Sequence, residues 1–282
     1  MNSYSADWAT KLYDLAHVHG PYLAASTIIW TAIYLASAPI SRRVSATYRG
    51  LPFKLKMQWD NRIVAFLHAV VICYAAFWGL LCDEPLKADH LHAYSTWAYA
   101  TMITACGYFI WDAVMCIIYF KEFQLGFLLH ALGCLFTFLG SLDGVFMYYG
   151  YFYLTFEAST PFLNLHWFMD KLGVSNSNPF KKLNAGLLVL SFFLFRIISG
   201  CGYSAVVWQD IHRYIAATSN MANVGIMYYF YFAILLLNGL NCYWFYSIVK
   251  FATRAPKVHP SSTSTSATTT ALTANDKARK KE

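Results

Sequence analysis

Apolar residues occur along the chain in seven blocks that short polar segments separate. The blocks cover residues 22–40, 62–82, 97–119, 124–142, 144–158, 184–208 and 225–249. Because a transmembrane helix needs about 20 consecutive apolar residues, the pattern predicts an all-α, multi-pass transmembrane bundle with about seven spans. The fifth block is short and Pro161 follows it, so a re-entrant helix paired with the fourth block is the alternative there. The aromatic stretch 162–169 predicts a segment at the membrane surface.

Composition supports a membrane protein and excludes most soluble classes. The 282 residues are 58% hydrophobic and only 12% charged, whereas a soluble domain carries about 25% charged residues. Such high hydrophobicity also excludes disorder as the main state. The seven cysteines form no metal-binding spacing, so we expect no metal and no cofactor.

The basic residues predict an orientation. With the N-terminus outside, seventeen of the 21 Lys and Arg residues fall on the cytosolic side and three fall outside, while Arg196 lies within a span. This bias is the positive-inside pattern, and it explains the net charge of +7 without nucleic acid as a partner. It predicts a lumenal segment over 1–21, a first transmembrane helix with a basic cytosolic loop over 22–58, a membrane domain over 59–250 and a disordered cytosolic tail over 251–282.

The C-terminal tail suggests a subcellular localisation. It is rich in Ser, Thr and Ala and ends Arg279-Lys280-Lys281-Glu282. This ending resembles a dilysine-type retrieval signal of the endoplasmic reticulum, with Arg where Lys is usual. The alternative is a generic basic tail on the cytosolic side.

Polar residues within the apolar blocks are the candidate functional residues, because ionisable groups are costly inside a membrane. Counting at about 1.5 Å per helical residue, four of them from four spans lie roughly 5–6 Å on the cytosolic side of the bilayer centre, and Arg196 lies slightly above them. The four are His68, Asp112, His130 and Asn241. A shared layer predicts a polar cavity between the helices. There, Asp112 would orient His130 or His68, or pair with Arg196, as general-base or nucleophilic chemistry requires.

A structural role is the competing interpretation. Polar side chains also hold membrane helices together, at about 0.6–2 kcal/mol per contact, and this interpretation is favoured for His68 and Asn241 taken alone. Glu157 lies at the end of the fifth block, where a charge costs little.

Around these positions the chain resembles the TLC-domain family, which includes the ceramide synthases and a set of smaller TLC-domain proteins. The resemblance lies in the order and spacing of several stretches across residues 59–250. They are Trp59-Asp60-Asn61-Arg62 with His68, Gly107-Tyr108-Phe109-Ile110-Trp111-Asp112, Leu128-Leu129-His130, Glu157-Ala158-Ser159-Thr160-Pro161-Phe162-Leu163-Asn164 with Trp167, Arg196, and Leu237-Asn238-Gly239-Leu240-Asn241-Cys242-Tyr243-Trp244. The pattern is most similar to the small TLC-domain proteins of lipid homeostasis.

The resemblance implies a helical barrel around an intramembrane cavity that is open to lipid. In ceramide synthases a His-His pair in the fourth span carries acyl transfer. Here His130 is present, but Ala131 takes the second position and Cys134 replaces a usual Thr.

The first functional hypothesis is therefore a protein of the endoplasmic reticulum membrane that binds or remodels a membrane lipid and acts in lipid homeostasis. Its lipid-binding candidates are His68, Arg196, Asn241 and Glu157. The alternative is a ceramide-synthase-like acyltransferase that takes acyl-CoA, with His130 and Asp112 as catalytic candidates. Whether a reaction occurs, which lipid is bound and whether the chain oligomerises stay open.

Overall fold

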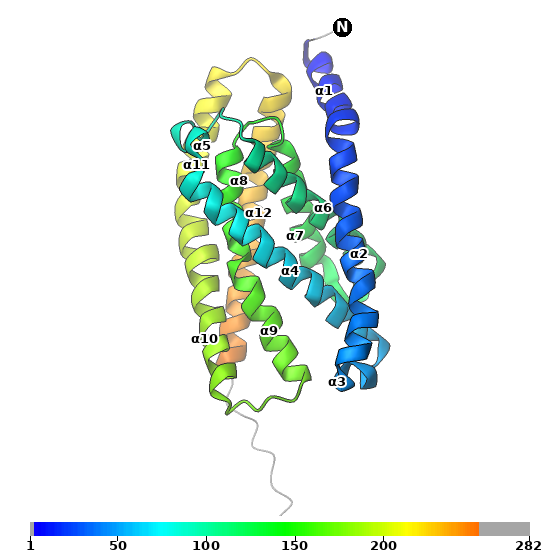
Figure 1. Cartoon of the computed structure of the whole chain (residues 1–282). Coiled ribbons are helices and arrows are strands. Elements are labelled where there is room, and N and C mark those ends of the chain that lie inside the picture. The colour runs from blue at the N-terminus through cyan, green and yellow to red at the C-terminus, as the bar shows by residue number, and fades with distance from the viewer. Residues whose placement is uncertain (1–2, 254–282) are drawn as a thin grey trace, which may run out of the picture.

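The computed structural model describes residues 3–253, and every regular element in this range is a helix. Figure 1 shows the helices packed as one bundle. In chain order they are α1 (Ser3–Asp14), α2 (Gly20–Val44), α3 (Ala46–Gly50), α4 (Phe53–Cys82), α5 (Glu84–Ala88), α6 (Thr96–Ile118), α7 (Phe120–Gly140), α8 (Met147–Leu154), α9 (Thr160–Lys171), α10 (Pro179–Phe192), α11 (Gly200–Ala217) and α12 (Met221–Ala252). The expected disordered tail lies, from residue 254 onward, outside the described residues.

Within residues 3–253, six helices are long and apolar enough to cross a membrane. They cover Trp8–Val44, Phe53–Cys82, Thr96–Ile118, Phe120–Gly140, Pro179–Ala217 and Met221–Lys250. Two of them continue through π-helical turns, at Leu15–His19 and Phe193–Ser199. Large apolar side chains point outward along them, such as Ile28 at 66% exposed and Leu235 at 60%. In water this surface would be unfavourable, so the protein is a multi-pass helical membrane protein.

The fifth apolar block differs from the expected span over 144–158. It forms α8, a 3-10 turn at Thr155–Ser159, and then α9, so no single helix of membrane length is present there. The break follows from Pro161, which has no N–H to donate to the carbonyl of Glu157. Together the three pieces run from the end of the bundle where α1 lies to the opposite end (Figure 1). The segment 162–169, expected at the membrane surface, belongs to α9, which packs against α4 and α10.

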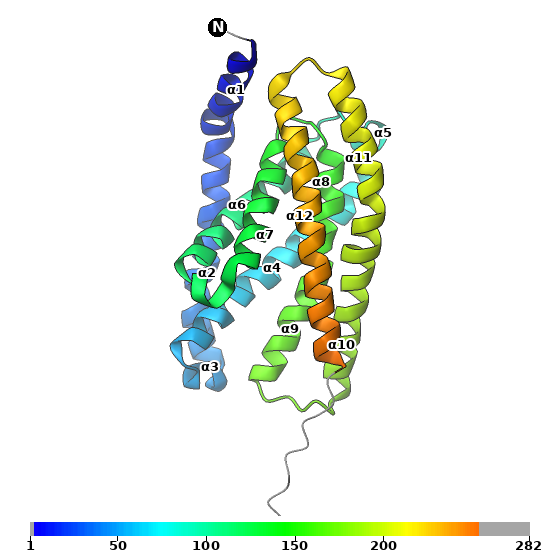
Figure 2. The same ribbon diagram turned by 180° about the vertical axis from the view of Figure 1, so that it is seen from behind.

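Two packed regions hold the bundle together. A larger one joins α2, α4, α6, α7 and α8, and its fully buried members include Ile72, Met102 and Phe109. A smaller one joins α8, α11 and α12 around Phe146, Ile211 and Met227. Seen from behind in Figure 2, α12 lies between α7 and α11. The candidate site lies where α12 faces α7 and α8.

Candidate functional site

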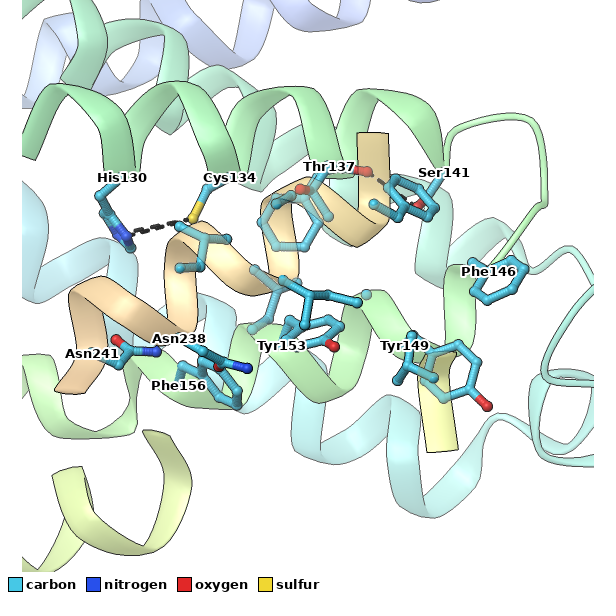
Figure 3. A pocket seen from close by; sticks show the side chains of 18 of the residues that line it. His130, Cys134, Thr137, Ser141, Phe146, Tyr149, Tyr153, Phe156, Asn238 and Asn241 are labelled. Atoms are coloured by element: carbon cyan, nitrogen blue, oxygen red, sulfur yellow. Dashed lines mark hydrogen bonds between the residues drawn. The ribbon is translucent and has the colours of Figure 1, made fainter. Parts of the chain in front are cut away.

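A long, narrow cavity runs between α7, α8 and α12. About 50 Å³ of it is open to a water-sized molecule. Most of its wall is apolar or aromatic, with Phe138, Ile234 and Leu237 along its length and Phe146 near one end. His130, Cys134 and Asn241 lie toward the other end, whereas the polar side chains of Ser141 and Tyr149 lie near Phe146 (Figure 3). The lining is of the kind that surrounds an alkyl chain with a polar end, and the side chains would have to move apart to admit one.

Arg196 and Glu157 form a buried ion pair at that polar end. Nη2 of Arg196 lies 3.2 Å from Oε1 of Glu157, and the two residues are only 5% and 8% exposed. Thr160 donates its hydroxyl to the second carboxylate oxygen at 2.6 Å. The prediction that a charge at Glu157 costs little is therefore wrong, because this carboxylate is enclosed and needs its partner.

The rest of the Arg196 guanidinium is also bonded. Its Nε donates to the carbonyl oxygen of Phe156 at 2.8 Å and to the hydroxyl of Ser159 at 3.2 Å. Its Nη1 donates to Oδ1 of Asn241 at 3.1 Å. The guanidinium thus satisfies backbone that the break between α8 and α9 would otherwise leave unpaired in an apolar environment.

His130 is a titratable cavity residue without a strong fixed partner. Its Nε2 lies 3.9 Å from Oε1 of Glu157, and its ring lies edge-on to Trp244 at 5.4 Å between centroids. The thiol of Cys134 lies 3.7 Å from its Nδ1. Since Arg196 is occupied by protein groups, His130 and Cys134 are the groups best able to contact a ligand at this end.

Two predicted site residues lie elsewhere. His68 is fully buried, stacks on Tyr108 at 3.7 Å between centroids, and has no hydrogen bond at either nitrogen within residues 3–253. Both His68 and His130 lie edge-on to Phe109. Neither His68 nor Asp112 lines the cavity.

Asp112 forms no hydrogen bond or ion pair with any described residue, so the expected pairing of Asp112 with His130, His68 or Arg196 is wrong. Glu157 takes that place. The depth estimate gave heights along the helices but no direction around them, which is why it placed Asp112 and His68 in the same group.

Other polar residues of the cavity were not predicted. Asn238 donates to the hydroxyl of Ser204 at 2.8 Å, and Tyr149 donates its hydroxyl to Asp210. Ser159 and Thr160 complete the Arg196 cluster. Ser159, Thr160 and Asn238 fall within the stretches that carry the family resemblance, and this could have identified them as site residues. Tyr149 lies in a Tyr-rich run outside those stretches, so nothing in the sequence singled it out.

The stretch 59–62 joins α4 to its neighbours outside the cavity. Asp60 accepts hydrogen bonds from Ser37 at 2.7 Å and from the hydroxyl of Tyr48 at 2.8 Å. Arg62 donates to Oδ1 of Asn164 on α9 at 2.9 Å. Burial, together with the bond to Asp60, raises the pKa of Tyr48 to about 12, so this hydroxyl stays a donor. These residues act as connectors between helices.

Comparisons with known proteins agree with the arrangement. The TLC domain family model matches residues 58–250. An uncharacterised TLC domain-containing protein of Schizosaccharomyces pombe is 33% identical over 240 residues, covering 83% of this chain and 78% of its own. TLC domain-containing protein 4 of Homo sapiens is 28% identical, covering 77% and 82%.

Protein CLN8 of Canis lupus familiaris is 31% identical over 191 residues, covering 64% of this chain and 66% of its own. No solved structure matches the chain. The family match spans the helices that build the cavity and includes every residue of the Arg196 cluster. The chain therefore belongs to the TLC-domain family of multi-pass membrane proteins.

Proposed function

We propose that the protein binds a membrane lipid in the cavity between α7, α8 and α12, and that it acts in lipid homeostasis. The observation that carries the proposal is the cavity itself, a largely apolar slot with His130, Glu157 and Arg196 gathered toward one end. The fatty chain would lie along Phe138, Ile234 and Leu237, and the polar part of the lipid would contact His130 and Asn241. Burial of an alkyl chain contributes about 0.8 kcal/mol per methylene group.

The test is to purify the full chain in mild detergent and to identify bound lipids by mass spectrometry. Leu237→Trp fills the slot and should lower lipid occupancy at least tenfold. Leu235→Trp is the matched control, because Leu235 lies on the same helix but is 60% exposed and does not line the cavity. Equal lipid content in wild type and both variants would contradict the proposal.

A second candidate function is acyl transfer, in which the protein remodels a lipid with acyl-CoA as donor. It is favoured by His130, whose ring lies in the cavity near a carboxylate. Glu157, and not Asp112, would be the partner of His130. A lipid product that disappears in His130→Ala would establish this function, whereas an unchanged lipid profile would remove it.

We place the protein in the endoplasmic reticulum membrane, with a lumenal N-terminus and a cytosolic C-terminus. The support is the positive-inside bias and the basic ending, which lies outside the described residues. Replacing Arg279, Lys280 and Lys281 with Ser should redistribute the protein to later compartments of the secretory route. Unchanged localisation would favour the alternative of a generic basic tail.

A further inference from the structure

We propose that Cys134 is a nucleophile that accepts a long-chain acyl group from an acyl thioester, with His130 as its base. The inference rests on the proposed lipid cavity and deepens it, because it names a reacting atom and a class of substrate. It assigns His130 a role different from that of acyl acceptor.

The geometry supplies a nucleophile, a base and a third group. Cys134 follows His130 by one helical turn, so both side chains lie on the same face of α7, and Figure 3 shows them side by side in the cavity wall. Sγ of Cys134 lies 3.7 Å from Nδ1 of His130 and 3.9 Å from Nε2. Oε1 of Glu157 lies 3.9 Å from Nε2. An activated nucleophile needs a base beside it and a third group that orients the base. Contacts between such groups are often long without substrate and shorten when substrate binds.

Glu157 is fixed so that it can orient the imidazole. Arg196 and Thr160 hold both of its carboxylate oxygens. A proton on Nε2 of His130 would face the carboxylate, which leaves Nδ1 as the unprotonated nitrogen. Because Sγ of Cys134 lies almost equally far from Nδ1 and Nε2, the imidazole must turn before Nδ1 takes the proton of the thiol.

Cys134 is distinguished from the other buried thiols. Cys73, Cys106 and Cys116 are buried to a similar degree, but none of them lines the cavity. The thiol of Cys73 donates to the carbonyl oxygen of Leu154 at 3.9 Å. Among the described residues, Cys134 is the cysteine whose sulfur contacts a histidine and also faces the slot.

The substrate class follows from the chemistry of a thiol beside an apolar slot. A thiol exchanges with a thioester, because the bond that forms is of the same kind as the bond that breaks. Phe138, Leu237 and Ile234 extend the slot beyond Cys134, so the alkyl chain of the acyl group would lie along them.

The step balances without oxidant or reductant. The sulfur of Cys134 forms a bond to the carbonyl carbon of the donor while His130 takes the thiol proton. The bond from that carbon to the donor sulfur breaks, and the leaving thiolate takes the proton from His130. The products are an S-acylated Cys134 and a free thiol.

The test uses the purified full chain with palmitoyl-CoA as the probe. Intact mass, peptide mapping and treatment with neutral hydroxylamine identify the adduct and its site. We expect one acyl group on Cys134 in wild type and in Cys73→Ala, and none at that position in Cys134→Ala. His130→Ala should slow the acylation by about 100-fold or more, as loss of a general base does. Cys134→Ser should give an ester that resists neutral hydroxylamine.

Three results would overturn the inference. They are equal acylation of Cys73 and Cys134, an adduct on His130 that persists in Cys134→Ala, and no adduct in a correctly folded wild type. Lipid analysis of the same preparation separates the two proposals. Bound lipid without an adduct would leave the lipid-binding proposal standing and remove this one, whereas the absence of both would overturn both.

Discussion

Arg196 shows why a charged residue can be kept inside this bundle. Its guanidinium serves two purposes, since it neutralises Glu157 and it bonds to the carbonyl of Phe156 at the break between α8 and α9. Burial of an ion pair gives little net stability, but removal of one partner leaves an uncompensated charge in an apolar environment. The pair is therefore best understood as the connection that makes the broken helix possible.

This gives a prediction for variants of the pair. Glu157→Gln should lower the free energy of unfolding by about 3–5 kcal/mol, because it leaves the Arg196 charge buried and unpaired. The double variant Glu157→Gln with Arg196→Met should be less destabilised than Glu157→Gln alone. Thermal unfolding in detergent is measured for Glu157→Gln, Arg196→Met and the double variant. If the losses of the two single variants simply add in the double variant, the residues do not form the coupled pair described here.

His68 should behave in the opposite way to His130. Its ring stacks on Tyr108, and neither nitrogen has a hydrogen bond among the described residues. An unsatisfied buried polar group costs about 1–3 kcal/mol, and a Phe ring, although larger, is also planar and can stack on Tyr108. His68→Phe should therefore keep or raise the unfolding temperature and leave bound lipid unchanged. His130→Phe, the matched variant in the cavity, should displace lipid. A loss of bound lipid in His68→Phe would show that His68 is a lipid-binding residue after all.

At this scale the sequence predicted which residues belong to the site better than it predicted which of them contact each other. It selected His130, Arg196, Asn241 and Glu157, which the structure brings together, because polar residues stand out in apolar blocks. It could not assign Glu157 to Arg196, since that contact depends on a turn between α8 and α9 and on how α10 and α12 are rotated. Cys134 was noted only as a replacement for the usual Thr and not as a site residue, because a lone cysteine in an apolar block resembles a small core residue.

At the scale of elements, the long helices followed directly from the apolar blocks, and only their ends moved. Backbone groups in a membrane must be satisfied internally, so a long apolar block has little alternative to a helix. The fifth block was different because a short block with Pro161 after it allows several outcomes. What decided among them was Arg196, a residue from another helix, and its contact could not be known from the local sequence.

Close contact between α2 and α6 depends on Gly107. A Cβ atom at this position would lie 2.1 Å from Oγ of Ser26 and 2.8 Å from its backbone carbonyl carbon. Gly107→Ala should therefore force the two helices apart and lower the unfolding temperature. Gly186→Ala is the matched control on α10, where the added Cβ meets nothing within 4 Å. The control should gain about 0.5–1 kcal/mol. Equal effects at both positions would show that the α2–α6 contact is looser than described.

At the scale of the whole molecule, the N-terminal helix is attached to the bundle through Asp143. Lys11 and His19 both contact this carboxylate, with His19 Nε2 at 3.1 Å, and Nδ1 of His19 lies 3.0 Å from the hydroxyl of Tyr99. Burial acts to raise the pKa of Asp143, but the hydrogen bonds and charges of Lys11 and His19 outweigh it and lower the pKa.

A pH dependence follows from this sign. A carboxylate with a lowered pKa stabilises the folded state above its unfolded pKa of about 3.9, and this contribution is lost as the pH falls through the lowered value. Asp143→Asn removes it at every pH. At pH 7 amide exchange in residues 8–14 should then rise roughly three- to tenfold, by analogy with the loss of a partly exposed ion pair. Asp89→Asn is the control, because Asp89 bonds only within its own loop. Unchanged exchange in Asp143→Asn would mean that other contacts hold α1.

The path of the chain through the membrane can be tested at two loops. Because α8, the 3-10 turn and α9 together run from one end of the bundle to the other, we expect seven crossings, although six helices within residues 3–253 have membrane length. The loop at 172–178 and the loop at 218–220 then lie on opposite sides.

The sequence contains no Asn-X-Ser/Thr acceptor, so acceptors inserted singly into these loops report their sides without background. With a lumenal N-terminus, only the acceptor near 218–220 should be glycosylated. If the fifth segment instead returned to its starting side, only the acceptor near 172–178 would be modified, and the seventeen basic residues would no longer share the cytosolic side. An acceptor fused before residue 3 shows whether the N-terminus is lumenal. With that side known, modification near 218–220 means that the fifth segment crosses the membrane, and modification near 172–178 means that it is re-entrant.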